Sequence, residues 1–103
     1  MVKVSHYEPA KGGVNCASFV SGECVSRMAN GERWQDYWGK NNTIACPREL
    51  LFGTEIILDG HSYVCRDRGG AIVITANGEY WIDILDPNPP YPFGTVVKAY
   101  IRE

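Results

Sequence analysis

An aspartate placed among apolar residues constrains the fold of this chain more than any other feature of its sequence. Asp83 lies between two isoleucines, in a run typical of a buried β-strand. A carboxylate there must be hydrogen-bonded, paired with a cation, raised in pKa or directed into a cleft, because an unpaired buried charge is costly. Asp67 ends another strand-like run, just before the glycine pair 69–70. Residues 63–86 therefore predict strands that carry two acidic side chains.

Most of the remaining chain predicts short strands separated by turns. The strand-like runs are residues 2–7, 43–46, 55–58, 62–66, 71–75, 79–85 and 96–102. Asp-Gly at 59–60 and Asn-Gly at 77–78 are typical of hairpin turns. Trp34, Tyr37 and Trp38 have helical spacing and predict a short helix near residues 31–39. We therefore expect an all-β fold with minor α content and, at 103 residues, a single domain spanning 1–103.

Two segments of the chain resemble each other. Phe52-Gly53-Thr54 and Phe93-Gly94-Thr95 each place a glycine and a threonine just before an expected strand. Repetition of this kind indicates two related halves. Together with the number of short strands, it favours a small pseudo-symmetric barrel of six or seven strands.

The four cysteines indicate disulfides rather than a metal site. Their spacing contains no C-x-x-C pair, and neither histidine completes a zinc pattern. Local pairing, Cys16 with Cys24 and Cys46 with Cys65, is our preferred connectivity among the three possible ones. The alternative is four reduced, buried thiols. Two disulfides suit a small β domain in an oxidising compartment.

Composition narrows the classes of partner. The chain is 45% hydrophobic and 21% charged, as in ordinary globular proteins, and its net charge of −2 gives little support to nucleic-acid binding. No apolar stretch is long enough to span a membrane, and no leader is visible. We expect a monomer without a cofactor, either extracytoplasmic or secreted with its leader absent from this chain, or a phage-type lysin.

At this point the sequence resembles a known family, from about residue 43 to residue 103. The motifs that carry the resemblance are IACP at 44–47, LFGT at 51–54, DRGGAI at 67–72, IDI at 82–84 and FG at 93–94. They resemble the three-aspartate domain of membrane-bound lytic transglycosylases and muralytic stationary-phase proteins. That domain is a six-stranded double-psi β-barrel. It is similar to the barrels of expansins, rare lipoprotein A-like proteins and small endoglucanases, which act on β-1,4-linked polysaccharides.

The resemblance implies roles for individual residues. Asp67 and Asp83 take two of the three aspartate positions, and Asp83 is expected to be the catalytic acid/base. Cys46 stands where the family has its first aspartate, so the full set of three is not present. The resemblance also implies that Tyr7 lines the groove and that Asp86 matches a further acidic position.

Simpler structural roles remain open for these residues. Asp67 is alternatively a turn residue that accepts N–H bonds from Gly69 or Gly70, and Asp83 a buried aspartate satisfied by a hydroxyl or an arginine. Tyr7 fits the core equally well, and Asp86 precedes a proline and fits a turn. Three further residues also have two interpretations each. Thr54 is a donor to a carboxylate or a cap at the start of a strand, and the pair Trp34 and Trp38 is a sugar-stacking wall or a cover over the core.

Two classes of function follow. The first is a peptidoglycan-cleaving lytic transglycosylase, in which Asp83 protonates the glycosidic oxygen and then activates the 6-hydroxyl of the sugar. The second is a non-catalytic polysaccharide-binding or expansin-like wall-loosening module, favoured by Cys46 in place of an aspartate. A small endoglucanase-like hydrolase, with Asp67 and Asp83 as its two carboxylates, is a further alternative.

Overall fold

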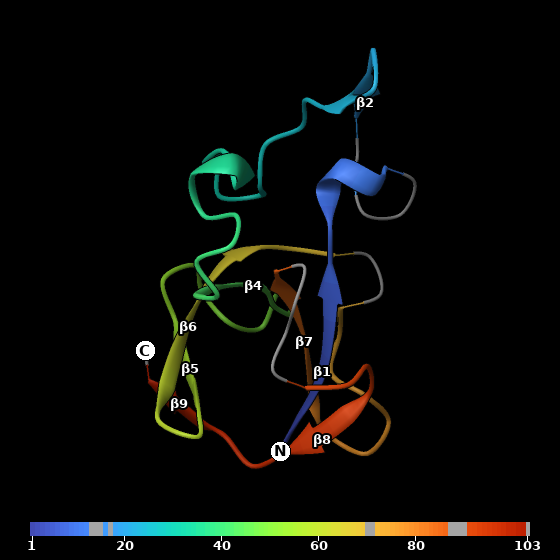
Figure 1. Ribbon diagram of the computed structural model, residues 1–103. Helices are drawn as coiled ribbons and strands as arrows, with labels where there is room; N and C mark the ends of the chain where they lie inside the picture. The colour runs from blue at the N-terminus through green and yellow to red at the C-terminus, as the bar shows by residue number, and fades with distance from the viewer. Residues whose placement is uncertain (13–15, 17, 70–71, 87–90, 103) are drawn as a thin grey trace.

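The fold is nearly all β. The computed structural model describes residues 1–12, 16, 18–69, 72–86 and 91–102. Its strands are β1 (Val2–Tyr7), β2 (Phe19–Val20), β3 (Glu23–Cys24), β4 (Thr43–Ala45), β5 (Glu55–Leu58), β6 (His61–Asp67), β7 (Tyr80–Leu85), β8 (Thr95–Val97) and β9 (Tyr100–Arg102). Seven of them form one sheet in the order β8-β1-β7-β4-β6-β5-β9, which curls into part of a barrel (Figure 1). Strands β2 and β3 form a separate hairpin.

Three local expectations need correction. The helix expected near residues 31–39 is a single 3₁₀ turn, η3 (Trp34–Asp36), because two glycines bound a segment too short to propagate an α-helix. The last strand, expected at 96–102, is divided at Lys98–Ala99 into β8 and β9. The strand expected at 71–75 is reduced to a bridge between Ile74 and Tyr80, and Ala71 lies outside the described residues.

Strand pairing divides the main sheet into two similar halves. In one half, β1 is parallel to β7 and antiparallel to β8, and in the other, β6 is parallel to β4 and antiparallel to β5. The halves meet where β7 and β4 pair antiparallel. Gly53 and Gly94 occupy matching places, with φ of 92° and 82°, and their N–H groups donate to Cys65 and Val4 respectively. The sequence repeat therefore marks a repeat of structure.

The two outermost strands of the sheet are consecutive in the chain. Strands β8 and β9 are separated by only two residues, yet β8 pairs with β1 and β9 pairs with β5. The C-terminal segment thus links the two ends of the curled sheet. The elements from η1 (Pro9–Lys11) to η3 lie beyond one end of the strands and form an upper layer (Figure 1).

Apolar side chains form two clusters on opposite sides of the central strands. Because side chains alternate along a strand, Val2 and Val4 of β1, with Ile82 and Ile84 of β7, face the first cluster. The second cluster contains Tyr7, Cys24, Met28, Trp34, Ala45, Ile72 and Leu85. It packs the sheet against the upper layer. The end of β1, where Tyr7 lies, is therefore enclosed between the two layers.

The cysteines form the two expected disulfides. Cys16 is bonded to Cys24 and Cys46 to Cys65. The first bridge belongs to the upper layer. The second joins the end of β4 to β6 inside the first cluster, where both cysteines are fully buried. The preferred local pairing is confirmed.

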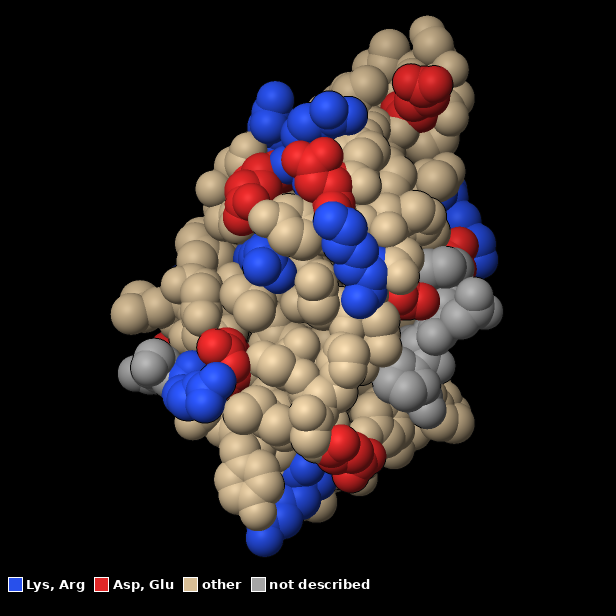
Figure 2. All heavy atoms as spheres, turned by 60° about the vertical axis from the view of Figure 1, so that its left-hand side comes forward, with Lys and Arg blue, Asp and Glu red and all other residues tan. Residues whose placement is uncertain are grey.

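Surface charge is mixed in sign. Acidic and basic side chains are interspersed on the face that Figure 2 shows. Among the described residues no helix is both long enough and apolar enough to cross a membrane.

Candidate functional site

Strand pairing brings the two expected catalytic aspartates onto one row across the sheet. Ser5 of β1 pairs with Asp83 of β7, Asp83 pairs with Ala45 of β4, and Ala45 pairs with Asp67 of β6. Residues in one row project to the same side of a sheet, and neighbouring strands lie roughly 4.8 Å apart. The two aspartates are therefore separated by one strand, whose residue at that level is a small alanine. A register irregularity at Ala45 brings Asp67 into this row.

Asp83 is half-buried and accepts a hydrogen bond from one hydroxyl. Ser5 Oγ donates to Asp83 Oδ1 at 2.8 Å, and Trp81 Nε1 donates to Ser5 Oγ at 2.9 Å. Burial raises the pKa of Asp83 to about 6, and the charge of Asp67 acts in the same direction. The Ser5 hydrogen bond and the nearby His6 oppose this rise in pKa. Asp83 thus has the carboxyl properties required of a proton donor near neutral pH.

Asp67 is held by donors from three segments of the chain. Tyr7 Oη donates to its Oδ2 at 2.9 Å, and the N–H groups of Ala29 and Arg68 donate to its Oδ1, each at 2.8 Å. The turn interpretation anticipated donors at Gly69 or Gly70. The described donors are Arg68 and Ala29 instead, and Gly70 lies outside the described residues. Asp67 therefore orders the end of β1 and the upper layer around itself.

Tyr7 connects the two aspartates electrostatically. Burial raises the pKa of the Tyr7 hydroxyl, and the charges of both Asp67 and Asp83 raise it further. Tyr7 is therefore a neutral donor, with its hydroxyl on Asp67 and its ring, which is 8% exposed, in the second cluster. The core interpretation of Tyr7 is thus confirmed for its ring, and a role of Tyr7 in lining a groove stays a prediction.

Comparison with family models, with curated proteins and with solved structures finds no match to this chain. The chemistry that the site can perform therefore has to be argued from its own geometry.

Two other expected site residues, Thr54 and Asp86, are buried. Thr54 is 2% exposed, and its hydroxyl has no hydrogen-bond partner in the described part of the chain, so Thr54 donates to neither aspartate. Asp86 follows β7 and is 5% exposed, and its charge acts on Tyr63 of the first cluster. The structure thus does not bring Thr54 into hydrogen-bond contact with either aspartate, and a role for Asp86 at the site stays a prediction.

The expected sugar-stacking tryptophans lie in the upper layer. Trp34 is 9% exposed and is a member of the second cluster, while Trp38 is half-buried and meets it edge to face at 5.7 Å. The ring of Trp34 thus serves mainly as a cover over the core. Stacking against a sugar stays a prediction for Trp38.

Another aromatic group is linked to Asp83 through Ser5. The ring of Trp81 has Lys3 Nζ 4.5 Å from its centre and Phe93 at 6.5 Å in an edge-to-face arrangement. Phe93 is 68% exposed. Trp81 therefore presents an aromatic edge of the site and at the same time orients Ser5 toward Asp83.

Sequence reasoning did not identify Ser5 or Trp81 as site residues. Ser5 lies 78 positions from Asp83, and only the parallel pairing of β1 with β7 joins them. The alternation along β7 does place Trp81 and Asp83 on one face, and this was the available signal. Among the described residues, no three His, Cys, Asp or Glu side chains gather as metal ligands.

Proposed function

We propose that this protein is a lytic transglycosylase that cleaves the β-1,4 glycan strands of peptidoglycan. The observation that carries the proposal is Asp83, a half-buried carboxyl whose pKa is raised to about 6, on one row with a second carboxylate. A carboxyl with that pKa is half protonated at about pH 6 and still about one-tenth protonated at pH 7, and it becomes a useful base once it has given up its proton.

One such group supports both steps of the reaction. Protonated Asp83 gives its proton to the glycosidic oxygen as the C1–O bond breaks. The resulting carboxylate then takes the proton of the sugar's 6-hydroxyl, whose oxygen bonds to C1 and closes a 1,6-anhydro ring. Asp83 ends the cycle protonated, and no water is consumed.

The neighbours of Asp83 have supporting roles in this scheme. Asp67 is fixed by three donors, so it offers a negative charge that can stabilise the positive charge developing at C1 without rearranging first. The Ser5 hydroxyl fixes the rotamer of Asp83 through Oδ1, and none of the described residues donates a hydrogen bond to Oδ2. Tyr7 orients Asp67.

We also propose that the sheet is a six-stranded double-psi barrel. If β8 and β9 are counted as one bent strand, the sheet has six strands. This bent strand then pairs with β1 on one side and with β5 on the other. The two similar halves support this proposal. The two disulfides are compatible with an extracytoplasmic location, as peptidoglycan cleavage by a secreted protein requires.

One observation favours a non-catalytic alternative. Cys46 stands where the resembling family has an aspartate, and it is committed to a disulfide with Cys65. A site with two carboxylates, one of them tied to three donors, also fits a module that binds polysaccharide without cleaving it.

Product analysis separates these functions. Purified sacculi are incubated with the parent protein, with Asp83→Asn and with Asp36→Asn, which makes the same substitution at an exposed position. We expect anhydro-muropeptides from the parent and from Asp36→Asn, and at least a hundredfold less from Asp83→Asn, since general acid catalysis contributes roughly 10²–10⁴-fold. Mass spectrometry identifies the products.

Each other outcome has a definite meaning. Reducing-end products without the anhydro ring indicate a hydrolase, and soluble cello-oligosaccharides from glucan indicate an endoglucanase-like activity. Binding to sacculi without products supports the binding module. Undiminished release by Asp83→Asn removes Asp83 as the acid/base.

A further inference from the structure

A pocket of about 350 Å³ is lined in part by Arg68 and Gly69, which directly follow Asp67 in the chain. Its lining combines two arginines, Arg48 and Arg68, with one carboxylate, Glu49, and an apolar wall of residues 72–74. Its volume is at the lower end of the range typical of ligand pockets. Neither aspartate lines it, so it is an additional feature of the surface near the site.

Three features connect this pocket to the site: a chain neighbour, a hydrogen bond and a shared residue. Arg68 directly follows Asp67, and the Val73 carbonyl accepts a hydrogen bond at 3.1 Å from the N–H of Trp81, two residues before Asp83. Ile72 is shared, because it lines the pocket and packs in the second cluster with Tyr7. The pocket is therefore connected to β6 and β7, the strands that carry the two aspartates.

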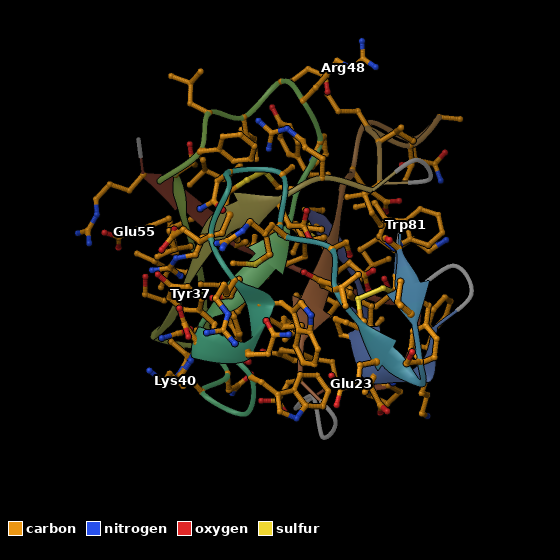
Figure 3. The ribbon with its side chains drawn as sticks, turned by 90° about the horizontal axis from the view of Figure 1, so that it is seen from above. Glu23, Tyr37, Lys40, Arg48, Glu55 and Trp81 are labelled. Atoms are coloured by element: carbon orange, nitrogen blue, oxygen red, sulfur yellow. A yellow bond between two sulfur atoms is a disulfide. The ribbon has the colours of Figure 1, made fainter. Side chains whose placement is uncertain are left out.

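Positive charge in the pocket is not neutralised by ion pairs in the described part of the chain. The Arg68 guanidinium is fixed by a 2.7 Å hydrogen bond to the Leu50 carbonyl, by contacts at 2.9 Å and 3.0 Å to the bonded sulfurs, and by the Phe52 ring. No described carboxylate forms an ion pair with it or with Arg48. Arg48 is exposed, stands at the edge of the molecule in Figure 3 and forms no side-chain hydrogen bond with the described residues.

We propose that this pocket binds a carboxylate on the peptide branch of the glycan substrate. Arg48 meets the carboxylate, Arg68 supplies a fixed positive charge, and residues 72–74 contact small apolar side chains next to it. The inference rests on the proposed function, since it makes peptide-bearing glycan the preferred substrate. An unsubstituted neutral glucan has no group that would use the two arginines.

Short peptides can test the pocket without any cleavage. They are titrated into the intact protein, and binding is measured by the shifts of the backbone amide signals in NMR. The probes are acetyl-Ala-Glu-Ala and its neutral counterpart acetyl-Ala-Gln-Ala-amide. We expect the acidic peptide to shift the amides of Gly69 and residues 72–74 and to bind at least fivefold more tightly than the neutral one. A fivefold difference corresponds to about 1 kcal/mol, the upper end for an accessible ion pair.

Charge substitutions of opposite sign sharpen the test. Arg48→Gln should weaken binding of the acidic peptide about fivefold, whereas Glu49→Gln should strengthen it, because it removes a like charge. Arg33→Gln makes the same charge change at an exposed position outside the pocket and should leave binding unchanged. Arg48 makes no described contact that holds the fold, so its substitution should not unfold the protein.

The outcomes distinguish this inference from the proposed function. Equal affinity for the two peptides, or no effect of Arg48→Gln, overturns the pocket assignment. Acetate that binds as tightly as the acidic peptide shows that the apolar wall is unused and overturns the peptide assignment. Peptide binding without cleavage of sacculi overturns the proposed function alone, and cleavage without peptide binding overturns the pocket alone.

Discussion

The surroundings of Asp83 shift the pKa of its carboxyl group in two opposite directions. Burial and the charge of Asp67 favour the neutral carboxyl, while the hydrogen bond from Ser5 and the neighbouring His6 favour the carboxylate. Burial is the largest of these effects, which sets the pKa of Asp83 at about 6. A surface aspartate, with a pKa near 4, is almost fully ionised at pH 6, whereas Asp83 is half protonated there.

This pKa has a consequence for stability that needs no substrate to measure. Between about pH 4 and pH 6 the folded state holds a proton that the unfolded state has lost, so stability falls as pH rises through this window. The contribution of Asp83 is therefore full below about pH 4 and lost above about pH 6. We expect the free energy of unfolding of the parent, relative to Asp83→Asn, to fall by about 2 kcal/mol between pH 4 and pH 7.5.

Urea denaturation of both proteins at several pH values measures this difference. Asp36→Asn serves as the control at an exposed position. It should track the parent across the whole range. A parent-to-Asp83→Asn difference that does not change with pH would show that the carboxyl is not perturbed by folding.

At the scale of elements, the matching positions of Gly53 and Gly94 show how the repeat is built. Both glycines precede a strand, both have positive φ, and each donates its N–H to a strand of its own half. A Cβ at Gly53 would meet nothing within 4 Å, and at Gly94 the nearest atom is Lys3 Cε at 4.0 Å. Glycine is therefore required for its backbone conformation and not for space.

Replacement of either glycine by alanine should thus cost about 1 kcal/mol of the free energy of unfolding, through backbone strain alone. Because the two turns belong to different halves of the sheet, the double variant should lose about the sum of the two single losses. Denaturant unfolding of the three variants measures this. A neutral substitution at either position, or a strongly non-additive double variant, would contradict the repeat as described.

Local signals in the sequence predicted the elements that depend on neighbouring residues. The Asp59-Gly60 turn between β5 and β6 and the preferred disulfide pairs are confirmed, because turn chemistry and short cysteine loops act over few residues. The prediction of a helix near residues 31–39 was wrong, because the segment between Gly31 and Gly39 is too short to propagate an α-helix and forms only the 3₁₀ turn η3.

Long-range register was not readable from the sequence, and the site depends on it. Ser5 meets Asp83 only because β1 pairs parallel with β7, and Asp67 joins the row only through an irregularity between β4 and β6. Neither pairing leaves a pattern in the strands themselves, since a parallel register is set by packing on both faces. The two aspartates were therefore predictable as candidates, and their hydrogen-bond partners were not.

At the scale of the whole molecule, the two disulfides hold different parts. Cys16–Cys24 stabilises the β2–β3 hairpin in the upper layer, whereas Cys46–Cys65 joins β4 to β6 within the first cluster. The second bridge also accepts hydrogen bonds from Arg68, the residue after Asp67. Stability of the sheet and order at the site should thus depend on the same bond.

Removal of each bridge should therefore have a distinct effect. Because its cysteines are 19 positions apart, loss of Cys46–Cys65 should cost about 3 kcal/mol from chain entropy, against about 2.5 kcal/mol for the separation of 8 in Cys16–Cys24. The cost of losing Cys46–Cys65 should exceed its figure of about 3 kcal/mol, because both buried sulfurs lose their packing and Arg68 loses two hydrogen-bond acceptors.

Hydrogen exchange locates these losses along the chain. In Cys46→Ala/Cys65→Ala, protection should fall at the amides of Ile44, Val64 and Ile84, which lie on three neighbouring strands of the main sheet. In Cys16→Ala/Cys24→Ala, those amides should stay protected while the β2–β3 hairpin opens, because the hairpin forms its own sheet. Equal loss of protection across the main sheet in both variants would instead show that the upper layer and the curled sheet unfold as one unit.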